Sequence, residues 1–318
     1  MKGKYFIKRL LAAIPTFFGI TLLCYVVSSM APGSPLDSLL LDPYITTEQL
    51  ELMRRQLGLD QPVMVQYLSW LRQFLHGNLG FSFRTARPVW SMILERLGPT
   101  MMISVASVAL SLLVAVPLGI MAAAKPYSLR DYGSSGLSFV LASTPNFFAG
   151  LALIYLLAVT FRLLPSGGMY DSSGEYRLGD LIRHMVLPTL VLSFQQMGSW
   201  IRYVRSSMLE VMQEDYIRTA RAKGLKRRAV ILKHGLKNSL IPVVTVVGMS
   251  IPTLVGGAVV TEQIFTWPGI GLLMVASIQA RDYPVIMGIT VVVAAVVLIA
   301  NIFIDLIYGV LDPRIRYE

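Results

Sequence analysis

Six apolar stretches constrain the fold of this 318-residue chain more than any other feature. A helix needs about 20 apolar residues to cross the hydrocarbon core of a bilayer, and unpaired backbone groups exclude open alternatives there. The fourth stretch is the least apolar, because Gln195, Gln196 and Ser199 interrupt it. The sequence predicts an all-α polytopic membrane protein with six transmembrane helices, at residues 10–30, 99–124, 136–161, 185–201, 240–260 and 285–308.

The composition supports this class. Only 14% of the residues are charged, whereas soluble domains carry about 25%. The net charge of +10 is compatible with nucleic acid or anionic lipid as a partner, but the basic residues lie beside the apolar stretches. We therefore expect contact with lipid and none with nucleic acid. Cys24 is the sole cysteine, so one chain can form no internal disulfide.

The distribution of Lys and Arg predicts the orientation. Positive charges concentrate in the N-terminal residues 2–9, in the segment 125–130, in the long loop 202–237 and in the tail 314–316. With six spans these four segments lie on one side, and the positive-inside rule makes that side cytoplasmic. We expect both termini in the cytoplasm, and we expect the first span to be a retained anchor because it is long for a signal peptide.

Four parts follow from these spans: an N-terminal transmembrane helix at 1–30, an extracytoplasmic loop at 31–98, a membrane core at 99–309 with a cytoplasmic loop at 206–238, and a tail at 310–318. Thr46 and Gln49 form a capping-box pattern before a short helix that ends at Gly58. A second amphipathic helix follows at 62–77. This cap could cover the first two spans or bind an external partner, and periodicity alone favours the covering role.

A polar insert, "DYIRTARAKGL" at 215–225, interrupts the apolar chain. It predicts a short helix from Asp215, a left-handed helix end at Gly224 and a second helix at 226–237. A solvated loop does not need apolar residues, whereas a helix face that enters a groove on another protein does. The insert therefore has the composition of a docking surface, since it contains Tyr216, Ile217, Ala220, Leu225 and Leu232.

The insert resembles the EAA loop of binding-protein-dependent ABC importer permeases, whose pattern is E-A-A-x-x-x-G-x9-I-x-L-P. Arg218, Thr219 and Ala220 fall on E-A-A, and Gly224 falls on the glycine. His234, Leu236 and Lys237 fall on I, L and P, so Lys237 departs from the pattern. The form here is similar to that of the dipeptide, oligopeptide and nickel branch. Further branch-like stretches are "QLGLDQPVMVQYLSWL" (56–71), "STPNFF" (143–148), "EQIFTWPGIGLL" (262–273), "RDYPVI" (281–286) and "LDPRIR" (311–316).

The resemblance implies a type I ABC importer permease fold in a bacterial or archaeal plasma (inner) membrane. It implies four partners besides lipid and a peptide substrate: a homologous second permease, two ATPase subunits and an extracytoplasmic solute-binding protein. The ATPases would bind ATP and Mg²⁺, and this chain would bind no cofactor. The resemblance assigns coupling to the ATPase to Glu214, Asp215, Tyr216, Arg218, Thr219, Ala220, Lys223, Gly224 and Leu225.

Enzymatic motifs are missing from the sequence. It contains no G-x-x-x-x-G-K-[ST], no G-x-S-x-G and no H-E-x-x-H, which are the signatures of nucleotide binding, serine hydrolysis and zinc proteolysis. The three histidines, His76, His184 and His234, are scattered along the chain. We therefore expect neither catalysis nor a metal site.

Polar residues within spans are candidates for the transport pathway. Asn146, Gln195 and Gln196 are assigned to its lining, although the glutamines could equally hydrogen-bond between helices. Asp305 is expected to form an ion pair with Arg314 or Arg316.

The stretch "TWPGIG" at 266–271 predicts a re-entrant turn or short helix at the outer mouth of the pathway. This assigns Phe265, Trp267 and Pro268 to an outer gate, with an interfacial anchor as the alternative for Trp267.

These features predict half of the pathway of an ATP-driven importer of di- and oligopeptides. Nickel, metal-chelate or glutathione import remains an alternative within the same branch. A stand-alone channel or secondary transporter would leave the 215–225 insert without a role, and a scaffold would not need Gln195 and Gln196.

Overall fold

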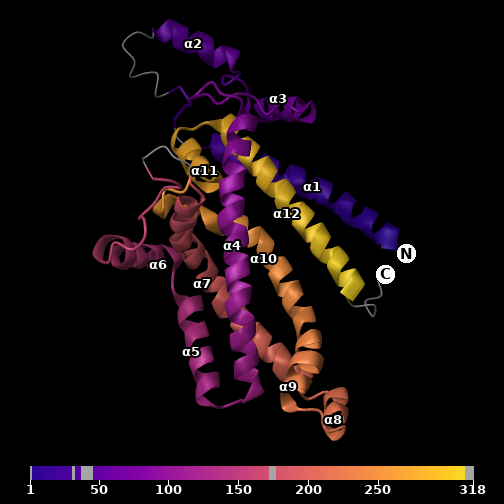
Figure 1. The fold of residues 1–318 in the computed structure, drawn as a ribbon. Helices are drawn as coiled ribbons and strands as arrows, with labels where there is room; N and C mark the ends of the chain where they lie inside the picture. The colour runs from indigo at the N-terminus through magenta and orange to yellow at the C-terminus, as the bar shows by residue number, and fades with distance from the viewer. Residues whose placement is uncertain (1, 31–32, 37–45, 172–176, 312–318) are drawn as a thin grey trace. The chain divides into compact units, whose positions relative to one another are not determined.

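The computed structural model describes residues 2–30, 33–36, 46–171 and 177–311, without the side chains of 2–10, 241–242, 251–257 and 303–311. The described residues form helices and no strand; their one β-bridge pairs Phe81 with Pro88. The helices are α1 (Lys2–Ser29), α2 (Thr47–Gln56), α3 (Val63–Leu75), α4 (Val89–Ala124), α5 (Leu129–Ser143), α6 (Asn146–Leu153), η2 (Ile154–Thr160), α7 (Leu178–Val211), α8 (Asp215–Ala222), α9 (Arg227–Ala229), η3 (Val230–Gly235), α10 (Leu236–Ile264), α11 (Ile270–Gln279) and α12 (Tyr283–Leu311) (Figure 1).

The described helices include 3 that are long and apolar enough to cross a membrane, or up to 5 if each of two bent pairs is one span. The three are Leu11–Ser29 in α1, Val89–Ala124, and Tyr283–Ile302 in α12. The weak fourth stretch, 185–201, lies inside the 34-residue helix α7. The chain is thus a helical, multi-pass membrane protein, and the count of six spans stays a prediction.

The chain divides into two compact units, which are described separately. The first contains residues 1–98 and 269–302, and the second contains 99–268.

In the first unit, aromatic side chains join α1 to α3. Trp70 stacks on Phe74 with ring centroids 5.6 Å apart, and Tyr67 stacks on the other side of Trp70 at 5.9 Å. Tyr25 of α1 meets Tyr67 edge-on, and its hydroxyl donates to Gln66 at 3.2 Å. This array fixes the predicted amphipathic helix on the first span.

The capping box before α2 is confirmed: Thr46 accepts from the backbone of Gln49, and Gln49 accepts from that of Thr46. Gly58 and Gly77 follow α2 and α3 with φ of +68° and +78°, where a side chain would be strained.

The core of the first unit packs the start of α4 against α11 and α12. Val89, Ile93, Val285 and Ile289 are buried there. The segment before α4 is held by Asp282, which accepts from the Ser82 hydroxyl and, at 3.0 Å, from the Phe83 backbone N–H. Asp282 is almost fully buried, so these hydrogen bonds compensate its desolvation.

In the second unit, α7 is packed between α5 and α10. Its buried residues include Trp200, Ile201 and Val204, and also the small residue Gly198, which admits a neighbouring helix. A Cβ added at Gly198 would lie 2.5 Å from the Ser138 carbonyl oxygen of α5 and 2.6 Å from the Ala142 nitrogen. Small residues permit such close approach of helix backbones.

The third span predicted at 136–161 is broken and does not run as one straight helix. The helix begins at Leu129, ends at Ser143 and resumes at Asn146, with a bend of 99° between the two pieces. Pro145 has no N–H to donate and pushes the preceding residue into extended geometry, and Thr144 has φ −77° and ψ 119°. The bend therefore lies at the proline of the stretch.

We predict that Gly198→Val lowers the free energy of unfolding by about 1–3 kcal/mol, the typical cost of overpacking, because its Cβ meets backbone atoms of α5. Thermal unfolding of the purified chain measures the change. Gly136→Val is the matched control, since a Cβ there contacts nothing within 4 Å. Equal melting temperatures of the two variants would contradict the close contact.

Candidate functional site

The polar insert forms α8, a helix of 8 residues whose first residue is Asp215. A carboxylate at the N-terminus interacts favourably with the helix dipole. The helix ends at Ala222 and is capped by Lys223, and Gly224 follows with φ +73°. The predicted left-handed helix end is confirmed.

The second helix of the insert differs from the prediction. Residues 227–235 form α9 and then the π-helix η3, and the chain continues directly into α10 at Leu236. The helical stretch predicted at 226–237 is therefore present from Arg227, but it does not end at Lys237. Lys237 stands where the family pattern has a proline, so no residue of that kind interrupts the helix.

A small apolar cluster holds α8 on η3. Ile217 and Ala220 of α8 are buried against Val230 of η3, with Met212 at the end of α7 packed beside them. Ile217 is 0% exposed and Ala220 is 6% exposed. The prediction that these two side chains would be open to a partner's groove is wrong, because they fill this cluster.

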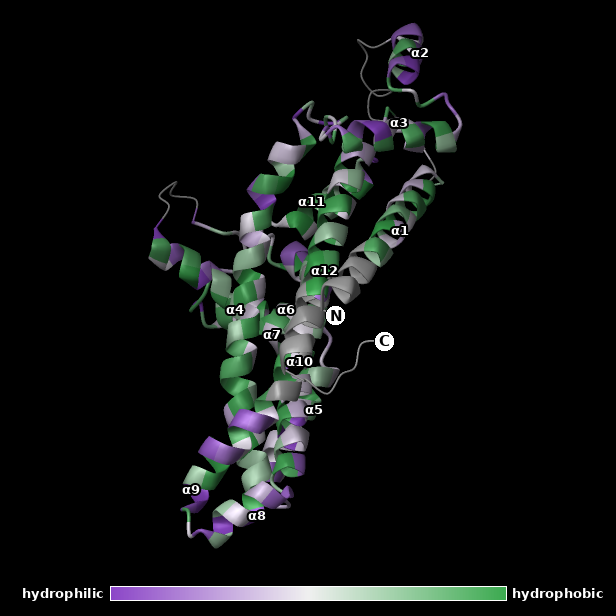
Figure 2. Ribbon diagram, turned by 90° about the vertical axis from the view of Figure 1, so that its right-hand side faces the viewer, coloured by the Kyte–Doolittle hydropathy of each residue, from purple (hydrophilic) through white to green (hydrophobic). Residues whose placement is uncertain are grey.

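The remaining residues of the insert form its open surface. Tyr216, Leu225 and Leu232 are 40%, 43% and 45% exposed. Asp215 and Arg218 pair at 3.3 Å, but both side chains are open to solvent, so the pair adds little stability. Figure 2 shows hydrophilic and hydrophobic residues alternating along α8 and α9. Exposed with them are Glu214, Thr219, Lys223 and Gly224.

Three further contacts connect the insert to α4, α7 and α10 of the same unit. The Asn238 side chain of α10 donates to the Tyr216 hydroxyl at 2.9 Å. Arg227 of α9 donates to the Ala124 carbonyl at the end of α4. Gly235 lies against α7, since an added Cβ would be 3.2 Å from Met208 Cε. Motion of α8 is thereby tied to α4, α7 and α10.

A buried ion pair, which the sequence reading missed, joins α5 to α7. Arg205 donates to both carboxylate oxygens of Asp131, at 2.5 and 2.8 Å. Asp131 is 3% exposed and also accepts from the Tyr127 backbone N–H at 2.9 Å. The turn before α5 is thus fixed to α7. An ionisable residue beside an apolar stretch was the available signal, but sequence alone could not name its partner.

The proposed pathway residues do not share one environment. Gln195 is exposed, whereas the half-buried Gln196 accepts from Ser111 of α4 at 3.5 Å. Asn146 is half-buried at the start of α6. Among the described residues no hydrogen bond joins these three side chains, so their common role stays a prediction.

The "TWPGIG" stretch forms a turn, with Thr266 at φ +48°, that leads into α11. Phe265 and Trp267 are 1% and 0% exposed, and the Trp267 indole donates to the Pro99 carbonyl at 2.9 Å. Full burial makes the interfacial-anchor alternative for Trp267 wrong. Pro268 is half-buried. The gate assignment stays a prediction.

Glu262, beside this turn, is another buried group that the sequence reading missed. It is 0% exposed and accepts from the Thr100 hydroxyl of α4 at 2.6 Å. It joins α4 and α10 within the second unit.

One described cluster has the composition of a metal site: Asp171, Asp180 and His184 place their ligand atoms within 4.8 Å of one another. His184 is buried, and its Nδ1 lies 2.9 Å from the Asp180 carbonyl oxygen. Arg162 and Arg183 line the same 220 Å³ cavity, and their charge opposes a cation. The histidines are scattered in sequence, yet the fold brings one of them to two carboxylates. The absence of a metal stays a prediction.

Comparison with known proteins gives the same family at both ends of the chain. A family model described as "Binding-protein-dependent transport system inner membrane component" matches residues 115–317, and its N-terminal counterpart matches 2–106. The oligopeptide transport system permease protein AppB of Bacillus subtilis is 45% identical over 314 residues, covering 98% of this chain and 99% of that one. The dipeptide transport system permease protein DppB of Escherichia coli K12 is 38% identical over 338 residues, covering 99% of each.

A solved structure of the MetNI methionine ABC transporter in inward-facing conformations has a similar fold. The TM-score is 0.54 at 14% identity, and the alignment covers 70% of this chain and 97% of that one.

We predict that Asp131→Ala lowers the free energy of unfolding by about 1–3 kcal/mol, because it leaves the half-buried charge of Arg205 without its partner. Adding Arg205→Ala should cost less than the sum of the single changes. Chemical denaturation of the purified chain gives the three values. The exposed pair Arg87–Glu95 is the control, and Glu95→Ala should cost less than about 1 kcal/mol. Additive effects at Asp131 and Arg205 would contradict the pairing.

Proposed function

Because the chain belongs to the family of binding-protein-dependent transport system inner membrane components, we propose that it forms half of the translocation pathway of an ATP-driven importer of di- and oligopeptides. The observation that carries the substrate class is near-complete alignment with permeases named for oligopeptide and dipeptide transport. The proposed partners are a second, homologous permease, two ATPase subunits that bind ATP and Mg²⁺, and an extracytoplasmic solute-binding protein. This chain itself binds no cofactor.

The proposed coupling element is α8 with its flanking residues 214–225. An element that transmits nucleotide-driven motion must make contacts that differ between two states, since only such contacts shift an equilibrium. The open surface around Asp215, Arg218 and Thr219 supplies groups for a partner. The buried Ile217 and Ala220 supply rigidity, because they hold α8 on η3.

The route from α8 into the membrane core is short. Through η3 it is continuous with α10, and Met212 joins it to α7. A displacement of α8 by the ATPase would be carried to both helices, which pack against each other. In this proposal, alternating access follows from movement of α7 and α10, with hydrolysis confined to the partner subunits.

Uptake into proteoliposomes tests the substrate. We expect the complex, supplied with its solute-binding protein and ATP, to import labelled di- to pentapeptides, and to import neither Ni²⁺ nor glutathione. The control is the same complex with a non-hydrolysable ATP analogue. ATP-dependent import of Ni²⁺ or glutathione without peptide import would replace the peptide assignment. Import without any ATPase subunit would indicate a channel or secondary transporter.

Ile217→Ser tests the coupling. Loss of a buried Ile side chain costs about 2–5 kcal/mol, so α8 should detach from η3 and peptide import should fall on the order of tenfold. Ile182→Ser is the matched control, since Ile182 is an exposed isoleucine near the start of α7 and outside the insert, and this variant should import normally.

The ATPase rate and co-purification of the subunits separate coupling from assembly. We expect the Ile217→Ser complex to hydrolyse ATP with little of the stimulation that the loaded binding protein gives to the wild type. Normal import by Ile217→Ser would contradict a coupling role for α8.

A further inference from the structure

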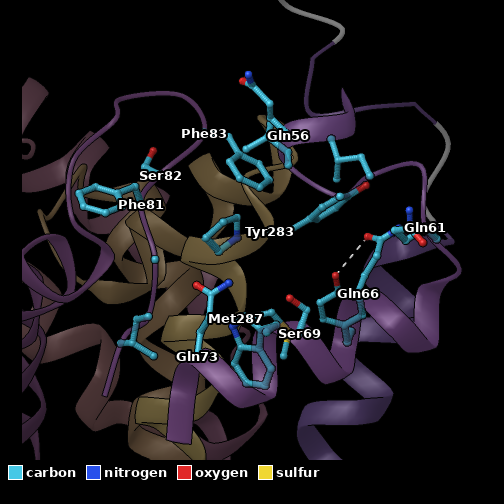
Figure 3. Close-up of a pocket in the computed structure, with 18 of the residues that line it drawn as sticks. Gln56, Gln61, Gln66, Ser69, Gln73, Phe81, Ser82, Phe83, Tyr283 and Met287 are labelled. Carbon is cyan, nitrogen blue, oxygen red and sulfur yellow. Dashed lines mark hydrogen bonds between the residues drawn. The ribbon is translucent and has the colours of Figure 1, made fainter. Parts of the chain in front are cut away.

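A cavity of 850 Å³ lies in the first unit, apart from every residue assigned above to coupling, pathway or gate. Its walls come from the end of α2, one face of α3, the segment 78–86 and the first turns of α12 (Figure 3). Ligand pockets for small molecules measure about 300–1,000 Å³. The cavity therefore has room for a short peptide segment.

The lining is mostly apolar, and its polar groups are uncharged. Although the chain carries a net charge of +10, none of the described residues that line the cavity is Lys, Arg, Asp or Glu. Its polar groups are mainly carboxamides, which both donate and accept as a peptide bond does; they belong to Gln56, Gln61, Gln66, Gln73 and Asn78.

Some of these groups are already bound within the chain. Gln66 accepts from Tyr25 and donates to the Gln61 carbonyl at 2.7 Å, and Asn78 accepts from the Gly80 backbone. In contrast, the side chains of Gln56 and Gln73 have no hydrogen bond to any described residue. Figure 3 shows Gln73 beside Met287 at the cavity.

The cavity also contains a buried donor without an acceptor. The indole Nε1 of Trp70 is shielded from solvent and has no hydrogen-bond partner in the described part of the chain. An unmet buried donor costs about 1–3 kcal/mol. Since Nε1 is shielded in the free chain, a carbonyl oxygen of a ligand satisfies it only when binding opens the packing around that atom. The ring of Trp70 is itself held by stacking on Phe74 and Tyr67.

We propose that this cavity binds the uncharged main chain of a transported peptide, at a site separate from the membrane pathway. The inference rests on the proposed function, and it identifies a second place where the permease recognises that substrate. Charged peptide termini find no opposite charge in the lining, and metal ions find no carboxylate. The carbonyl and N–H groups of internal residues match the free Gln73 carboxamide and the Trp70 indole.

The uncharged lining predicts that the cavity does not distinguish a peptide with charged termini from one without them. Acetyl-tetraalanine amide, which has no charged terminus, should bind as tightly as tetraalanine, and added salt should change its affinity little, because no ion pair forms. Titration followed by saturation-transfer NMR, with the complete permease–ATPase complex in lipid nanodiscs, measures both affinities. The binding protein is left out so that only the permease complex is probed.

Two substitutions locate the site. Trp70→Phe keeps an aromatic side chain but removes the donor together with part of the indole ring, and Gln73→Ala removes an exposed carboxamide without touching the core. Each should weaken binding of acetyl-tetraalanine amide by about two- to tenfold, the worth of one hydrogen bond. The matched controls are Trp90→Phe and Gln279→Ala, at exposed positions of the same unit outside the cavity, and they should bind as the wild type does. Melting temperatures verify that all four variants are folded.

Three results would overturn the proposal: no binding of acetyl-tetraalanine amide, unchanged affinity in both cavity variants, or tighter binding of maltotriose, another uncharged ligand of aromatic and amide sites. Peptide import by the wild-type complex is measured in parallel. If the complex imports peptides but does not bind acetyl-tetraalanine amide, only the proposal of the cavity site is refuted. If it imports no peptide, the proposed function is refuted, whatever the cavity binds.

Discussion

The close packing of α7 against its neighbours is the constraint on which the second unit depends. At Gly198 the backbone of α5 lies where a side chain would be, and at Gly119 a Cβ would come within 2.6 Å of Val204. In a bilayer the hydrophobic effect contributes little to helix association, so close van der Waals contact and specific polar pairs must hold the helices together. The pair Asp131–Arg205 and the hydrogen bond between Thr100 and Glu262 supply the polar part. Every element that reaches α8 is attached to this packed set.

The sequence predicted what depends on local chemistry and missed what depends on tertiary contact. Apolar length and capping patterns located α1, α4, α12 and the two short helices of the cap, and Gly224 has the left-handed geometry expected of it. Pro145 marks the place of the break after Ser143, but its angle of 99° could not be predicted, because hydropathy continues across it. The continuation of the insert into α10 could not be predicted either, because Lys237 stands where the family pattern has a proline and left the helix end undefined. The partners of Asp131 and Glu262 lie 74 and 162 residues away along the chain, and no local pattern specifies such pairs.

The same distinction between local chemistry and tertiary contact applies to the insert at 215–225. Its composition indicated a docking surface, and sequence reasoning assigned both its apolar and its polar residues to a partner. In the fold these residues divide: Ile217 and Ala220 face inward, whereas Asp215, Arg218 and Thr219 face outward. A helix that transmits motion needs both kinds of contact. A partner bound to its outer surface can displace the membrane helices only if its inner face is packed tightly against them. In the proposed coupling role, the burial of Ile217 is therefore as much a requirement as the exposed surface is.

Charge is distributed in a way that fits two kinds of partner. The 214–228 segment is rich in charged groups open to solvent, and such groups favour orientation and association with a protein surface. The cavity in the first unit excludes charge from its walls and offers carboxamides and an indole instead. Ligands whose termini and side chains vary share only their main chain, so a site that must accept many peptides gains generality by recognising amide groups. A charged wall would select among peptides by their side chains, and the neutral lining avoids that selection.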